Sequence, residues 1–150
     1  MDSRHPALSH TGAMQKIATA IHDEGIAFNV RTRSGHDIRV EGTAAEVQSG
    51  PGPMELLLVG LATCSSTNVV EMLTKMRQPF TSLEIDVSGE RAPDPPRIWT
   101  DIALHYRIKG NVDPRRLERA IWLSDNKICS VYAMLSAVAS IQSTYEIAAG

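Results

Sequence analysis

The chain has 150 residues, of which 43% are hydrophobic, and carries 15 Lys and Arg against 17 Asp and Glu. This is the composition of one ordinary globular domain, which is large enough to be stable without disulfides or a metal. The near-neutral charge provides no basic surplus, and aromatic residues make up only 5% of the chain. These two features exclude nucleic acid as an expected partner.

The start of the chain and the length of its apolar runs indicate in which cellular compartment the protein is expected. The first residues, MDSRHPALSHTGAM, lack the basic start and apolar core of a signal peptide, and no apolar run is expected to be long enough to cross a bilayer. We therefore expect a cytoplasmic protein with no membrane partner. In that reducing compartment, the two cysteines are expected to be free or redox-cycling. Residues 1–13 are predicted to be a disordered tail, and residues 14–150 a single domain.

The first half of the chain is predicted to form strands and then a long helix. Residues 15–21 form a weak strand, and residues 26–42 alternate apolar and polar side chains around a Ser-Gly turn, which is typical of a hairpin. A loop rich in Gly and Pro follows. Pro53 suits the first turn of a helix, where a missing N–H costs nothing. The helix is predicted to run from Pro53 to about Arg77.

In the second half of the chain, the spacing of the apolar residues changes several times. Residues 82–90 and 97–108 alternate as two strands, and residues 112–124 form a helix that begins with an Asp-Pro cap. Residues 129–140 have apolar side chains at helical spacing, and residues 141–147 close the chain as a strand. The order of strands, long helix, strands, helices and strand predicts an α+β fold rather than an alternating α/β fold.

The long central helix is apolar on nearly every face. Its apolar residues are Leu56, Leu57, Leu58, Val59, Leu61, Ala62, Val69 and Val70. A helix that is apolar all round must be buried all round, and one sheet covers only one side. We expect a second copy of the same helix, in a twofold dimer, to cover the other side. The alternative is that the last two helices cover it within one subunit.

The two cysteines have different predicted surroundings. Cys64 lies about three turns into the central helix, where the positive end of the helix dipole no longer reaches and desolvation would raise the thiol pKa. Cys129 lies at or just ahead of the last helix, beside Lys127 and near unpaired backbone N–H groups, which predicts a lowered pKa. No Cys/His cluster indicates a metal site. On these residues alone, inert core cysteines remain an alternative to a reactive pair.

Three segments resemble a known family: residues 52–78, 88–110 and 117–147 are similar to the OsmC/Ohr family of osmotically inducible and organic hydroperoxide resistance proteins, and within it to the YhfA-like branch. Both cysteines fall at the family's two cysteine positions, the second in a K-x-C-S-V setting. The resemblance implies an OsmC-like α+β fold, with an antiparallel sheet and a long buried central helix. It also implies an intertwined homodimer with active sites built from both chains.

The resemblance also implies thiol peroxidase chemistry of the peroxiredoxin type, with no cofactor. Cys64 would attack an organic hydroperoxide and become a sulfenic acid, and Cys129 would resolve it as a disulfide. The implied partners are a small organic hydroperoxide and a dithiol reductant. Two thiols that meet in space make such a cycle feasible, and a buried first thiol needs a nearby cation to ionise.

The sequence departs from the family pattern around this first thiol. The position of the family's supporting Glu holds Met54, and Glu55 follows it, about 100° further round the helix. The hairpin has no Arg at the matching position, so Arg31, Arg33 or Arg91 are the candidates to supply the charge. The alternative for Arg31 and Arg33 is that they are solvated strand residues. The alternative function is a catalytically weak or inactive dimer that binds an apolar ligand or senses redox state.

Overall fold

The structure is a computed structural model that describes residues 14–42 and 47–150. The chain falls into two compact units, one ending at Pro53 and the other formed by Met54–Gly150. The predicted tail over residues 1–13 lies outside the described residues. The expectation of a single domain stays a prediction.

The N-terminal unit is built on a three-stranded antiparallel sheet, ordered β1 (Ala18–His22), β2 (Ala27–Thr32) and β3 (Asp37–Glu41). The predicted hairpin is confirmed, because β2 pairs with β3 and Gly35 adopts a φ of 87° in the turn between them. This left-handed conformation is one that glycine adopts without steric cost. The weak first strand is also present, shifted to the C-terminal side of the predicted 15–21.

Helix α1 (Pro53–Lys75) opens the second unit and has the predicted start. Its end is well defined. Arg77 adopts a left-handed φ of 55°, and the Gln78 N–H donates to the Leu73 carbonyl at 2.9 Å. This pair of features is the Schellman motif, which satisfies carbonyls at a helix C-terminus. Pro79 comes next and cannot continue a helix.

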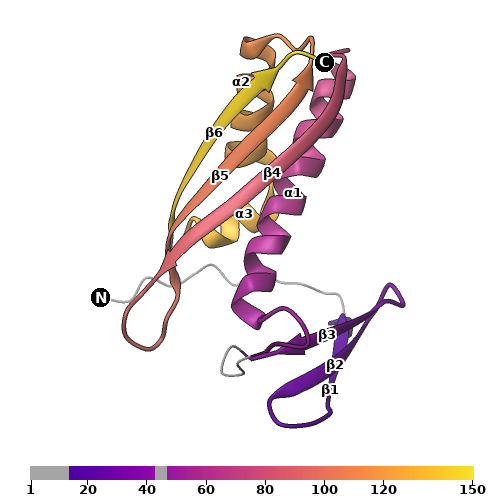
Figure 1. Ribbon diagram of the computed structural model, residues 1–150, viewed down its shortest axis with the longest axis vertical. Coiled ribbons are helices and arrows are strands. Elements are labelled where there is room, and N and C mark those ends of the chain that lie inside the picture. Colours follow the sequence, from indigo (N-terminus) through magenta and orange to yellow (C-terminus); the bar gives the residue numbers. More distant parts are fainter. Residues whose placement is uncertain (1–13, 43–46) are drawn as a thin grey trace. The chain divides into compact units, whose positions relative to one another are not determined.

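The second sheet has the order β4 (Phe80–Arg91), β5 (Trp99–Gly110) and β6 (Ser140–Ala148). Strands β4 and β5 are antiparallel, but β5 and β6 are parallel. The sheet is therefore mixed rather than wholly antiparallel as predicted. The reason is the connection: helices carry the chain back to the opposite end of the sheet before β6 begins, and such a crossover makes neighbouring strands parallel (Figure 1).

Between β5 and β6 the chain forms α2 (Pro114–Leu123), a π-helix η1 (Ser124–Ile128) and α3 (Ser130–Leu135). The predicted cap of α2 is confirmed, because the Asp113 side chain accepts hydrogen bonds from the backbone N–H groups of its first turn.

The last helix is shorter than predicted. The expected span was residues 129–140, but α3 ends at Leu135 and the chain turns into β6. Met134 and Val138, which suggested a longer apolar face, are 76% and 59% exposed. Their helical spacing therefore does not mark a face that packs against this subunit's core.

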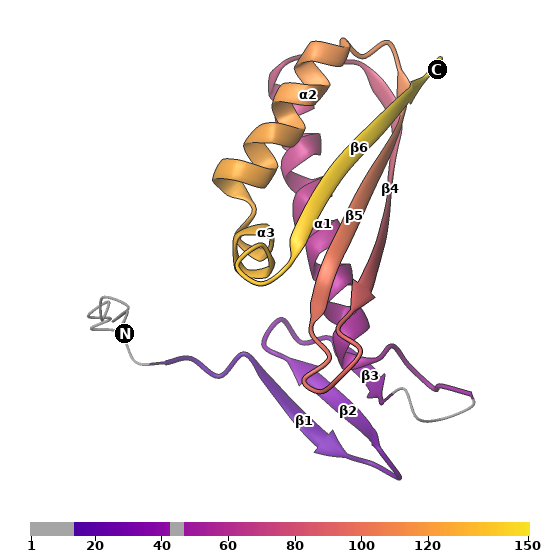
Figure 2. The same cartoon turned by 90° about the vertical axis from the view of Figure 1, so that its left-hand side faces the viewer.

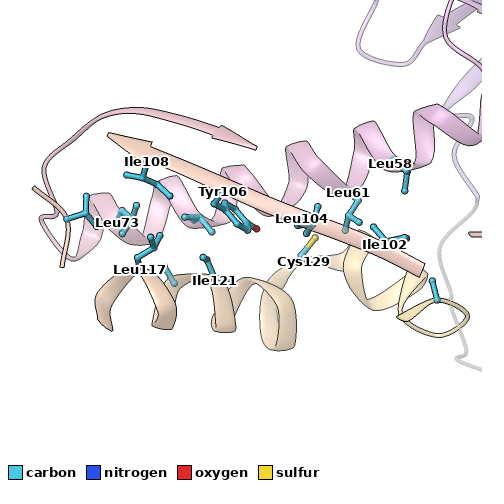
Figure 3. Packing of buried hydrophobic residues seen from close by; sticks show 14 residues of the cluster. Leu58, Leu61, Leu73, Ile102, Leu104, Tyr106, Ile108, Leu117, Ile121 and Cys129 are labelled. Atoms are coloured by element: carbon cyan, nitrogen blue, oxygen red, sulfur yellow. The ribbon is translucent and has the colours of Figure 1, made fainter. Parts of the chain in front are cut away.

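The core of the second unit lies between its sheet and its helices, which all cover one face of that sheet (Figure 2). Strand β5 alternates strictly, with Ile102, Leu104, Tyr106 and Ile108 buried toward the helices. Leu117 and Ile121 of α2 join this cluster, as does the Cys129 side chain (Figure 3). The α+β prediction is confirmed.

Helix α1 buries only one face in this subunit. We call this its inner face, and its members are Leu58, Leu61, Ala62, Ser65, Val69 and Leu73. On other sides of the helix Leu57 and Val59 remain 44% and 45% exposed. The last two helices therefore do not cover the whole of α1, which contradicts the alternative of complete coverage within one subunit.

The expectation that no apolar run could cross a bilayer was wrong by length and composition. Helix α1 has 23 residues and is long and apolar enough to cross a membrane. Its inner face, however, packs into the cluster of buried residues described above. A long apolar helix whose side chains fill the protein's own core is accounted for without a membrane.

Candidate functional site

The structure brings together two cysteines that are far apart in the sequence. Cys64 lies in α1 and is half-buried, whereas Cys129 is only 2% exposed and forms the N-cap of α3. Both are free thiols. The Cys64 side chain packs against the cluster of buried residues that includes Cys129, and Cys64 is one of the groups that raise the Cys129 pKa. The two sulfur groups are therefore neighbours within one subunit.

The surroundings of Cys129 raise its pKa, which contradicts the predicted lowering. Burial is the largest cause, and the neighbouring Cys64 side chain adds to it. The Tyr132 backbone N–H, 3.3 Å from Sγ, and the Ser65 hydroxyl act in the opposite direction but are outweighed. The sequence pattern correctly indicated a backbone N–H at the thiol, but it could not show how completely the core desolvates the sulfur.

The π-helix sets the position of Cys129. The Cys129 backbone N–H donates to the Ser124 carbonyl at 2.8 Å, and this hydrogen bond closes a wide turn before α3 begins. Single π-turns of this kind are often found at functional sites. Lys127, expected beside the thiol, instead places its ammonium group 5.8 Å from the centre of the Trp122 ring.

Buried and half-buried polar groups form a row of hydrogen bonds that begins at Cys129. The Ser65 hydroxyl donates to Cys129 Sγ at 3.6 Å, and the Ser124 hydroxyl donates to the Ser65 carbonyl at 3.5 Å. Asn68 Nδ2 donates to the Ser124 hydroxyl at 3.5 Å. Sequence reasoning missed these residues. The one available signal was a serine on the otherwise apolar inner face of α1.

Arg91 is engaged near the start of α1. Its Nε donates to the Arg97 carbonyl at 2.7 Å, and its guanidinium lies 5.7 Å from the centre of the Trp99 ring. Trp99 in turn donates from Nε1 to the Met54 carbonyl at 3.0 Å. At 1.5 Å per residue, Met54 is about 15 Å along the helix from Cys64. This placement does not bring Arg91 next to the thiols.

Glu55 is exposed in the first turn of α1, where the helix dipole favours a carboxylate. Arg31 and Arg33 are exposed on the N-terminal unit. There Arg31 pairs with Asp37 across the hairpin, and Arg33 donates to Gln15. The roles of Glu55, Arg31 and Arg33 toward Cys64 stay predictions. Within residues 14–42 and 47–150, no group of three or more His, Cys, Asp or Glu side chains could hold a metal ion.

Comparisons with known proteins agree with this architecture. Residues 42–144 match the family of OsmC-like proteins. The chain is 35% identical over 127 residues to Protein YhfA of Escherichia coli K12, covering 84% of this chain and 93% of YhfA. A hypothetical protein from Aquifex aeolicus VF5, known from its crystal structure, is 30% identical with a TM-score of 0.82, covering 92% of this chain and 99% of that one.

A more distant structure shows the same fold. The organic hydroperoxide resistance protein OsmC from Legionella pneumophila is 14% identical with a TM-score of 0.68, covering 90% of this chain and 98% of that one. At this identity the likeness is one of fold alone.

Proposed function

We propose, for a chain that belongs to the family of OsmC-like proteins, that Cys64 and Cys129 reduce organic hydroperoxides in a cytoplasmic homodimer. The observation that carries this proposal is that Cys64 packs against the cluster of buried residues that contains Cys129. The substrate class is supported by distant structural neighbours whose names include organic hydroperoxide resistance.

The chemistry balances with these two thiols and a dithiol reductant. The Cys64 thiolate attacks the hydroperoxide, the O–O bond breaks, and the products are Cys64 sulfenic acid and, after uptake of one proton, an alcohol. The Cys129 sulfur then attacks the sulfenic sulfur, forming the disulfide and releasing water that contains the thiol proton. A dithiol returns the disulfide to two thiols by exchange and is itself oxidised.

The exposure of the two side chains supports these separate roles. Cys64 is half-buried and hence open on one side, whereas Cys129 is almost fully enclosed. The raised pKa of Cys129 keeps its thiol protonated at neutral pH. A protonated, enclosed thiol is a poor first nucleophile, but it is well placed to react with a sulfenic acid that forms beside it.

The dimer part of the proposal rests on the side of α1 that this subunit does not bury. Six residues follow one another there at alternating spacings of four and three, which is the seam spacing of a two-stranded coiled coil. We call them the outer stripe, and they are Leu56, Gly60, Thr63, Thr67, Val70 and Thr74. The three threonine hydroxyls donate to carbonyls four residues earlier. With their hydroxyls satisfied, the threonines can present methyl groups to a second copy of the helix.

A binding or redox-sensing role is the second candidate. It is favoured by Arg91, whose guanidinium is engaged near the start of α1, and by Met54 at the position where the family carries its supporting Glu. Without an assisting cation, a thiol with the ordinary pKa of about 8.5 is only a few per cent ionised at pH 7. Such a protein would keep the thiol pair and react slowly with hydroperoxides.

Consumption of cumene hydroperoxide with dithiothreitol as reductant separates the two candidates. We expect turnover by the wild type and loss to the buffer rate in Cys64→Ser. Cys129→Ser should still form a sulfenic acid on Cys64, which dimedone labelling and mass spectrometry would detect. Ser66→Ala is the matched control, because the Ser66 hydroxyl donates within α1 to the Ala62 carbonyl at 2.7 Å. If the wild type consumes cumene hydroperoxide no faster than Cys64→Ser does, the peroxidase role is ruled out and the binding or sensing role remains.

A further inference from the structure

The Cys129 sulfur accepts two hydrogen bonds in the core of the second unit. The Ser65 hydroxyl on α1 donates to Sγ at 3.6 Å, and the Tyr132 backbone N–H in the first turn of α3 donates to Sγ at 3.3 Å. Figure 3 shows the Cys129 side chain, with its sulfur in yellow, pointing from the last helices toward α1 and β5. Hydrogen bonds to an ionised acceptor are stronger than those to a neutral one, so both donors favour negative charge on this sulfur.

Ser65 is held at the sulfur by the packing of α1. It belongs to the inner face of that helix, where its neighbours are apolar, and its side chain is completely buried. A buried hydroxyl without a partner would destabilise the core. The partner of the Ser65 hydroxyl is the Cys129 sulfur, which lies 64 residues further along the chain.

The backbone around the sulfur is also fixed in place. The Ser124 carbonyl accepts a hydrogen bond from the Cys129 N–H at 2.8 Å, and the Ser124 hydroxyl donates to the Ser65 carbonyl at 3.5 Å. Ser124 is completely buried as well. It joins α1 to the turn before α3 through backbone groups of both residues, so the Ser65 hydroxyl and the sulfur keep their relative positions.

The exposure of the two cysteines determines which sulfur of a disulfide between them a reductant would reach. Cys64 is half-buried, whereas Cys129 is 2% exposed. A dithiol from solvent would therefore attack Cys64, and Cys129 would be the leaving group. A sulfur leaves faster when its thiolate is more stable, and burial destabilises the thiolate of Cys129. Hydrogen-bond donors at this sulfur oppose that effect.

We propose that Ser65 is a catalytic residue of disulfide reduction, whose hydroxyl stabilises the Cys129 thiolate as it leaves. This inference rests on the proposed redox function and concerns the return to the reduced state. The dithiol sulfur bonds to Cys64, the S–S bond breaks, and its electron pair moves to the Cys129 sulfur. The second sulfur of the dithiol then displaces Cys64, which closes the oxidised cyclic disulfide. The two protons of the dithiol end on Cys64 and Cys129.

The role predicts a particular relation between rate and equilibrium. At pH 7 the Cys129 sulfur is neutral in the disulfide, and its raised pKa keeps it neutral as a thiol. Negative charge therefore develops on this sulfur in the transition state. Loss of a donor to that charge slows reduction and its reverse by the same factor, and it leaves the equilibrium unchanged. A variant that strains or loosens the core would shift the equilibrium as well.

The test uses the full-length protein and the disulfide that diamide forms in it, which requires no peroxidase step. Dithiothreitol then reduces this disulfide at pH 7, and both the rate and the equilibrium constant are measured for the wild type and Ser65→Ala. The control is Ser66→Ala, which removes the hydroxyl of the next residue, bonded to the Ala62 carbonyl at 2.7 Å. Consumption of cumene hydroperoxide by the wild type is measured in parallel.

We expect Ser65→Ala to be reduced about tenfold more slowly than the wild type, with an equilibrium constant within twofold. Ser66→Ala should match the wild type within twofold in both quantities. A rate for Ser65→Ala within twofold of the wild type would overturn the role of Ser65. A shift of its equilibrium constant as large as the change in rate would do the same, because the effect would then be structural.

The outcomes for Ser65 and for the peroxidase are separate. If the disulfide shows the expected pattern but the wild type does not consume cumene hydroperoxide, the role of Ser65 stands and the peroxidase proposal fails. If hydroperoxide is consumed but Ser65→Ala is reduced as fast as the wild type, the peroxidase stands and the role of Ser65 fails. If diamide forms no disulfide between Cys64 and Cys129, the role of Ser65 is overturned.

Discussion

The two sides of helix α1 differ in both composition and surroundings. The inner face is buried in the core of the second unit, and it includes the fully buried Leu61 and Ser65. The outer stripe runs along the same helix, but its smaller residues, such as Gly60 and Thr67, are not covered in this way. Cys64 lies between them, half-buried. One helix thus has a core face, a side that the subunit leaves open and a thiol at their boundary.

This difference shows why overall hydrophobicity was a poor guide to burial. The apolar residues of α1 suggested that all sides are buried alike. The subunit instead buries a stripe with helical spacing and leaves Leu57 and Val59 almost half exposed. The inner face is expected to contribute to the free energy of unfolding of each subunit, and the outer stripe to the free energy of dimer formation.

The largest expected effect comes from a large-to-small change on the inner face. Leu61→Ala should lower the free energy of unfolding by about 3 kcal/mol, because Leu61 is completely buried and its loss leaves a cavity. Urea unfolding followed by circular dichroism measures this. The matched control, Leu57→Ala, removes an exposed side chain of the same size and should cost about 1 kcal/mol or less. Equal losses in the two variants would contradict the division of α1 into two faces.

A smaller effect is expected from enlarging the outer stripe. A Cβ atom added at Gly60 would meet nothing within 4 Å in the subunit, and replacing a helical glycine raises helix propensity. Gly60→Leu should therefore leave the subunit folded but keep two helices apart. We expect the dimer dissociation constant to rise at least about tenfold, or about 1.4 kcal/mol, in sedimentation equilibrium.

Arg119→Leu, which adds an exposed leucine on α2, is the control for this change and should leave the dimer intact. If Gly60→Leu dimerises as tightly as the wild type, the outer stripe is not the subunit interface. A wild-type protein that is monomeric at all concentrations would exclude the dimer itself.

Much of the fold could be predicted because it depends on local patterns. Alternation fixed the strands, and the Asp113 cap and Pro53 fixed the starts of two helices. The parallel pairing of β6 could not be predicted in this way, since pairing direction depends on where the chain returns to the sheet. The end of α3 was also misplaced, because Met134 and Val138 have helical spacing without a partner face in this subunit.

The two cysteines of the candidate site could be named from the sequence, whereas the residues around them could not. The resemblance placed both cysteines at family positions, and in the structure Cys64 packs against the buried cluster that contains Cys129. The pKa of Cys129 was predicted in the wrong direction because desolvation depends on residues from several elements. Ser65 had one local signal, as a serine on an apolar helix face, whereas Ser124 resembles a surface residue of a helix end.

The smallest expected effect concerns the desolvated thiol beside the inner face. The pKa of Cys129 is raised in the folded state, so an unfolded chain, with a thiol pKa of about 8.5, ionises first as the pH rises. The unfolded state then binds fewer protons than the folded state, and stability is lost through the window above about pH 8.5, by at most about 1.4 kcal/mol per pH unit. Below that window the thiol is neutral in both states and contributes no loss.

Cys129→Ala should remove this part of the alkaline loss when reduced protein is unfolded in urea between pH 7.5 and 9.5. Cys64→Ala should retain it, because burial, rather than the neighbouring Cys64 side chain, is the main cause of the raised pKa. The upper limit of pH 9.5 keeps the measurement below the ordinary pKa of tyrosine. An alkaline loss in Cys129→Ala as large as that of the wild type would mean that Cys129 is not desolvated, and that the inner face does not enclose the thiol as the structure shows.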